Sequence, residues 1–87
     1  MIKNEVTIKN ATGLHLRPAG VLAKIASGCK SDIILVKGDK RVNPKSVLNV
    51  MSAQINKGDN ITIEVSGDTE VEDMKKIVDA IESGLGE

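Results

Sequence analysis

The stretch that most constrains the fold is residues 61–66, where apolar and polar side chains alternate without a break. The apolar positions are Ile61, Ile63 and Val65, and the polar positions between them are Thr62, Glu64 and Ser66. An alternation with a period of two places every apolar side chain on one face of an extended chain. The stretch therefore predicts a β-strand that is buried on one face and open on the other.

Three other stretches also predict strands. Residues 2–9 alternate at their end, so that their apolar side chains share one face. Residues 32–37 form a β-branched, apolar run, which predicts a strand with apolar side chains on both faces. A Gly-Asp turn at residues 38–39 then leads into residues 40–42, a short and basic stretch that suits the edge of a sheet.

Two longer stretches show helical periodicity. Residues 16–27 carry apolar side chains on one face, and Gly28 follows at the usual stop position. A last helix is predicted to follow a capping box at residues 69–72 and to end at Gly84. Its apolar stripe consists of Val71, Met74, Ile77, Val78 and Ile81. Both stretches therefore predict helices with one apolar side.

A shorter helix is predicted over residues 47–53, with Ser46 as its N-cap. Its apolar face is expected to contain Val47, Val50, Met51 and Gln54. Leu48 falls off this face, so we expect its side chain to be exposed.

The predicted elements follow in the order β-α-β-β-α-β-α. Four strands and three helices, with helices apolar on one side, predict an α+β fold in which the helices cover one face of a four-stranded antiparallel sheet. The chain has 87 residues and no internal repeat. We therefore expect a single domain over residues 1–87 with a modest core.

The core has to be built from aliphatic residues because the chain contains no Phe, Tyr or Trp. Proteins that stack on single-stranded nucleic acid rely on aromatic side chains, so this class is disfavoured. No apolar run reaches membrane-spanning length and no N-terminal signal pattern is present, so we expect a cytoplasmic protein without membrane insertion. The lone Cys29 cannot form an internal disulfide and is expected to be a small buried hydrophobe. One His and one Cys also make a zinc site within a single chain unexpected.

The net charge is zero, but its distribution is uneven. Residues 1–58 carry ten basic against three acidic side chains, which gives +7, and residues 59–87 carry two against nine, which gives −7. Such asymmetry indicates either a basic docking face for an acidic partner or a solvated surface with two complementary halves. Because no dense basic tract is present, phosphate groups or acidic proteins suit the chain better than DNA.

His15, the only histidine, lies between Gly13 and Pro18 at the expected start of the first helix. Gly13 permits a tight turn, and Pro18 is favoured in a first helical turn. The unpaired N–H groups of that turn and the guanidinium of Arg17 both favour an anion. An imidazole nucleophile beside them predicts a phosphorylated histidine. The alternative is that His15 only caps the helix or stands in solvent.

Two segments carry a family resemblance. Residues 6–18, VTIKNATGLHLRP, and residues 42–52, VNPKSVLNVMS, resemble the signatures of HPr, the histidine-containing phosphocarrier family of the bacterial sugar phosphotransferase system. The resemblance implies an open-faced β-sandwich. It also implies that Enzyme I phosphorylates His15, with phosphoenolpyruvate as ultimate donor, and that sugar-specific IIA domains receive the phosphoryl group. We expect a monomer, although the sequence does not set the oligomeric state. No cofactor or metal is implied, and the chain would be a substrate of other enzymes rather than an independent catalyst.

The resemblance also implies roles for individual residues. Arg17 would orient the phosphoryl oxygens. The supporting positions would be Thr12, Gly13, Leu16 and Pro18. Ser46 would be the regulatory serine that HPr kinase/phosphorylase phosphorylates and that a catabolite-control transcription factor recognises; the structural alternative is that it serves only as a helix cap. The partner-docking positions would be Lys24, Lys45, Val47, Leu48 and Met51.

Two other functions stay open. One is an HPr-like regulatory binding module that acts through phospho-Ser46 in carbon catabolite repression, although relatives of this kind typically lack the active-site histidine that this chain keeps. The other is a small interaction domain with a basic face, in which His15 is incidental. The chain departs from residues common in the family at Leu16, Gly20, Cys29, Asn49 and Gln54. These departures bear on partner preference and on regulation rather than on the histidine itself.

Overall fold

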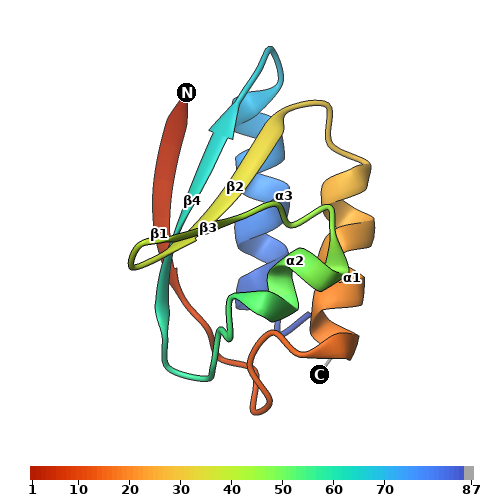
Figure 1. Cartoon of the computed structure of the whole chain (residues 1–87). Coiled ribbons are helices and arrows are strands. Elements are labelled where there is room, and N and C mark those ends of the chain that lie inside the picture. The colour runs from red at the N-terminus through yellow and green to blue at the C-terminus, as the bar shows by residue number, and fades with distance from the viewer. Residues whose placement is uncertain (86–87) are drawn as a thin grey trace.

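The computed structural model describes residues 1–85 and confirms the predicted order of elements (Figure 1). The strands are β1 (Ile2–Thr7), β2 (Asp32–Lys37), β3 (Lys40–Val42) and β4 (Asn60–Ser66). The helices are α1 (Leu16–Ser27), α2 (Val47–Ser52) and α3 (Glu70–Glu82). The bounds of α1, β2 and β3 are those predicted, whereas β1 ends two residues early and α2 one residue early.

The four strands form one antiparallel sheet in the order β1-β4-β2-β3. β4 lies inside the sheet, where Ile63 is opposite Asn4 of β1 and Leu35 of β2. The three helices cover one face of the sheet and leave the other face open (Figure 1). The predicted open-faced α+β fold is therefore confirmed, and the short basic strand β3 lies at the edge as expected.

The core lies between the sheet and the helices. The alternation in residues 61–66 places Ile61, Ile63 and Val65 there, each at most 1% exposed. The two longer helices add Ala19, Leu22, Ala26, Ile77 and Ile81. Because alanine is small, α1 leaves room for the larger aliphatic side chains of α3, against which it packs.

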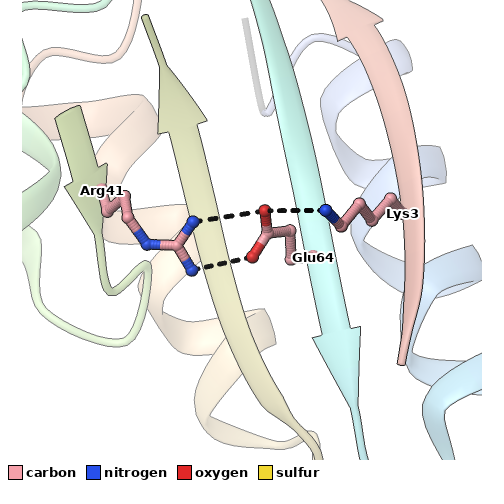
Figure 2. A network of polar contacts seen from close by, with 3 residues as sticks. All are labelled: Lys3, Arg41 and Glu64. Carbon is pink, nitrogen blue, oxygen red and sulfur yellow. Dashed lines mark hydrogen bonds and ion pairs between the residues drawn. The ribbon is translucent and has the colours of Figure 1, made fainter. Parts of the chain in front are cut away.

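The open face of the sheet carries a network of charged side chains (Figure 2). Arg41 of β3 reaches across β2 and donates two hydrogen bonds to Glu64 of β4, at 2.8 and 3.3 Å. Lys3 of β1 approaches the same carboxylate at 3.8 Å. The hydrogen bonds from Arg41 lower the pKa of Glu64. Glu64 points to the open face as predicted, but it is only 9% exposed, because the long side chains beside it shield it from solvent.

The start of α3 differs from the predicted capping box. Thr69 is the N-cap residue, but its side chain makes no cap hydrogen bond, and its hydroxyl instead donates to Asp73 Oδ2 at 2.7 Å. The side chain of Thr69 is thus turned towards the buried carboxylate, with which it forms a charge-assisted hydrogen bond. Val71, predicted to lie on the apolar stripe, is 71% exposed. The reason is that Asp73 is buried in this first turn, and residues two apart do not share a helix face.

Gln54 does not belong to the apolar face of α2, contrary to the prediction. The helix ends at Ser52, and Gln54 follows in a left-handed conformation with φ of 53°. This conformation turns the chain away from the helical path, so the Gln54 side chain is exposed while Val50 is buried. Lys37 Nζ donates to the carbonyl oxygen of Gln54 at 2.6 Å. The lysine thereby satisfies a carbonyl just beyond the end of the helix.

Candidate functional site

His15 is the N-cap residue of α1, with an extended backbone at φ −82° and ψ −165°. Its carbonyl oxygen accepts a hydrogen bond from the N–H of Ala19 at 2.8 Å, and this is the first hydrogen bond of the helix. Its imidazole makes no cap hydrogen bond, and the residue is exposed. The side chain therefore does not serve as a helix cap, and its ring is open to a partner.

The loop before His15 is fixed by the two preceding residues. Gly13 has φ of +66°, and a Cβ atom there would lie 2.3 Å from the carbonyl oxygen of Ile55. Leu14 is buried, and its N–H donates to that same oxygen at 2.9 Å. Glycine alone allows both the left-handed turn and this close approach. The loop is therefore held against the segment before β4, and it presents His15 outward.

The first turn of α1 suits a negatively charged group. It consists of Leu16, Arg17 and Pro18 and contains no acidic residue. N–H groups at such a position have no partner within their own helix and attract anions. Arg17 is exposed and takes part in none of the ion pairs among residues 1–85. Its guanidinium is thus available to bind an anion at the histidine, and exposed Thr12 lies in the loop just before.

Ser46 is exposed and is the N-cap of α2, where its Oγ accepts the N–H of Asn49 at 3.3 Å. The predicted capping role is confirmed. Sequence reasoning missed the part that Asn49 plays: its Oδ1 accepts the N–H of Asn43 at 2.6 Å, so its side chain ties the turn before Ser46 to the helix. A polar side chain where the family commonly has glycine was the only available signal.

The expected docking residues differ in accessibility. Leu48, at the start of α2, is 81% exposed as predicted, and Leu16, at the start of α1, is 68% exposed. Val47 and Met51 are half-buried against the core. The two charged positions are Lys24, exposed in the last turn of α1, and Lys45, whose Nζ donates to the carbonyl oxygen of Ser31 at 3.1 Å. Because α2 packs against α1 (Figure 1), the exposed leucines lie on two neighbouring helices.

Cys29 is 4% exposed, which confirms that it is a small buried residue. Burial, followed by the charge of Asp73, raises the pKa of its thiol. A thiol that stays protonated is a poor nucleophile. Cys29 therefore adds no reactive group to the site.

The arrangement at His15 combines a nucleophilic nitrogen, a cation and helix N–H groups on an open surface. Within residues 1–85 there is no pocket and no group of three side chains that could hold a metal ion. In the same range no helix has the length and apolar character needed to cross a membrane. The exposed imidazole, the exposed guanidinium and the helix N–H groups make this surface suited to a negatively charged group.

Comparison with known proteins agrees with this chemistry. Residues 2–83 match the family described as PTS HPr component phosphorylation site. The chain belongs to the HPr family. The phosphocarrier protein HPr of Neisseria meningitidis serogroup A is 37% identical over 87 residues, which cover 100% of this chain and 98% of that protein.

Further relatives include both HPr and Crh proteins. The crystal structure of HPr-C-His from Thermoanaerobacter tengcongensis matches with a TM-score of 0.95 at 41% identity, covering 100% of this chain and 98% of that one. The HPr-like protein Crh of Bacillus subtilis is 34% identical over 77 residues, which cover 88% of this chain and 91% of that protein. These matches place the chain in the HPr phosphocarrier family of the phosphotransferase system.

Proposed function

We propose that His15 accepts a phosphoryl group from phospho-Enzyme I and passes it to sugar-specific IIA domains. The observation that carries this proposal is the exposed imidazole of His15 at the N-cap of α1, which makes no cap hydrogen bond. The first turn that follows contains the exposed Arg17 and no acidic residue. The match of residues 2–83 to a family described by its phosphorylation site supports the proposal.

The proposed reaction is a transfer between two nucleophiles. A ring nitrogen of neutral His15 attacks phosphorus, a P–N bond forms, and the bond from phosphorus to the donor breaks with its electron pair leaving to the donor. The attack leaves a positive charge on the imidazole ring. Release of the proton from the other ring nitrogen removes this charge. Arg17 and the N–H groups of the first turn hold the phosphoryl oxygens. These contacts stabilise the phosphohistidine only enough that the phosphoryl group can still be transferred to a IIA domain.

One incubation tests the proposal. The protein is mixed with phosphoenolpyruvate, Enzyme I and magnesium, and its mass is measured before and after acid or base treatment. We expect a gain of one phosphoryl group that is labile in acid and stable in base, and no gain for His15→Ala. Full acid-labile phosphorylation of the His15→Ala variant would overturn the assignment.

We propose a second phosphorylation site at Ser46, with a regulatory role. Its hydroxyl is exposed at the start of α2, two residues before the exposed Leu48. A phosphate there would bring two negative charges to the proposed docking surface and change how partners bind. HPr kinase/phosphorylase and a catabolite-control transcription factor are the partners proposed for this state. The test is incubation with HPr kinase/phosphorylase and ATP, where Ser46→Ala should remain unmodified.

The Crh relatives favour a second candidate function, a regulatory binding module in carbon catabolite repression that acts through phospho-Ser46. The exposed imidazole of His15, which makes no cap hydrogen bond, favours the carrier function instead. Failure of His15 to accept a phosphoryl group, together with modification of Ser46, would select the regulatory module. We also propose that the carrier acts as a monomer, which light scattering of the unmodified protein would check.

A further inference from the structure

The loop that leads to His15 begins at a buried polar residue. Asn10 is 3% exposed, and its Nδ2 donates to the carbonyl oxygen of Gly84 at 2.5 Å. The two residues are 74 positions apart in the chain. The side chain therefore ties the start of the loop to the segment that follows α3, at the end of the molecule where this loop also lies (Figure 1).

The backbone of Asn10 holds the same loop from within. Its carbonyl oxygen accepts the N–H of Gly13 at 3.0 Å, which closes the turn just before the histidine. Ile55 holds the other side of the loop through the N–H of Leu14. Both the side chain and the main chain of Asn10 therefore lie on the path from the end of α3 to His15.

The anchor on the far side is itself fixed. Gly84 has φ of +93° and follows the end of α3, with its N–H donating to Ile81 at 3.1 Å. The next residue, Leu85, is 1% exposed, and its N–H donates to Ala80 at 3.2 Å. A carbonyl held between a helix end and a buried leucine is a rigid acceptor. It can therefore set the position of Asn10.

We propose that Asn10 is a positioning residue for phosphoryl transfer, which acts by fixing the loop that presents His15 at the start of α1. This inference rests on the proposed function of His15. Reacting atoms must meet within a narrow range of distance and direction, and a misplacement of about 1 Å can cost roughly a hundredfold in rate. A loop that has lost one of its tethers should populate the productive geometry less often.

The test compares Asn10→Ala with Thr69→Ala. The control variant also loses a side-chain hydrogen bond, the one from half-buried Thr69 to Asp73, but at the opposite end of α3. Transfer from phospho-Enzyme I is measured against carrier concentration, at a temperature where circular dichroism shows each variant fully folded. We expect kcat of Asn10→Ala to fall by roughly tenfold, part of the loss that misplacement can cause. KM should stay unchanged because the proposed docking side chains are intact, and Thr69→Ala should transfer like the parent.

Asn10→Asp separates the hydrogen bond from the shape of the side chain. It keeps the volume but has no donor for the Gly84 carbonyl, so its kcat should fall at least as far as that of Asn10→Ala. If the buried charge prevents folding, Asn10→Ala decides alone. An unchanged kcat in Asn10→Ala, a change confined to KM, or an equal loss in Thr69→Ala would each overturn the inference. A parent protein that accepts no phosphoryl group would instead overturn the proposed function.

Discussion

Replacing Asp73 by asparagine tests the contact that ties the start of β2 to the start of α3. The Asp73 side chain is buried, and its Oδ2 accepts the N–H of Ser31 at 3.0 Å and the hydroxyl of Thr69 at 2.7 Å. Hydrogen bonding from the side chain of Ser31 and then from that of Thr69, with a smaller contribution from the Ser31 N–H, lowers the pKa of Asp73 from 3.8 to about 2. The carboxylate therefore stabilises the fold in its ionised form.

The pKa difference gives the size and the direction of the effect. Because the pKa of Asp73 is lower in the folded state, its contribution is present above pH 3.8 and is lost as the pH falls towards about 2. One pKa unit corresponds to about 1.4 kcal/mol, so the full contribution is about 2–3 kcal/mol. Asp73→Asn keeps the shape and removes the charge. We expect it to be less stable than the parent by about 2–3 kcal/mol at neutral pH and nearly equal to it at a pH of about 2.

Urea unfolding followed by far-UV circular dichroism measures this difference, since the chain has no Trp or Tyr for fluorescence. The free energy of unfolding is compared for parent and variant across the acid range. Glu5→Gln, at an exposed carboxylate of β1, is the matched control and should differ from the parent by a small, constant amount. A gap between Asp73→Asn and the parent that stays the same at every pH would refute the reasoning.

Four further changes probe separate parts of the molecule. Gly20→Ala should raise the free energy of unfolding by about 1 kcal/mol, because a Cβ there meets nothing within 4 Å in the middle of α1; thermal unfolding checks it. Gln54→Gly should raise it by up to about 1 kcal/mol, since the left-handed residue loses its strain while Lys37 keeps its main-chain acceptor; an unchanged urea midpoint would contradict this. Arg17→Ala should slow transfer to His15 by about tenfold or more, which corresponds to the free energy of a hydrogen bond from a charged group. Its stability should not change, because Arg17 is exposed and outside the ion pairs of residues 1–85. Ser46→Asp, which preserves an N-cap, should be nearly neutral in stability yet slow phosphorylation of His15, whereas Ser46→Ala should cost about 1 kcal/mol; an Asp variant with the parent's rate would leave Ser46 as a cap alone.

Local patterns were enough to predict the order of the elements and most of their bounds. The alternation around Ile63, the apolar face of α1 and the glycine-containing turns act over a few residues, and neighbours in the chain decide them. The same holds for His15, because Gly13 and Pro18 place it at a helix start through their own backbone preferences. Where local signals compete, prediction from sequence was wrong. Thr69 makes no cap hydrogen bond and donates its hydroxyl to Asp73. Gln54 leaves the helical path through a left-handed conformation.

The sequence by itself thus determined which segments form strands and helices, most of the side chains that meet the core, and where the only histidine lies. The tertiary structure decided the strand order and the shielding of Glu64 by Arg41. It also decided the contact of Asp73 with Ser31, 42 positions away, and that of Asn10 with Gly84, 74 positions away. A buried asparagine or aspartate has no periodic signature. Its partner is set by which distant segments the sheet and helices bring together when they pack, and that depends on the whole core rather than on any stretch of the chain.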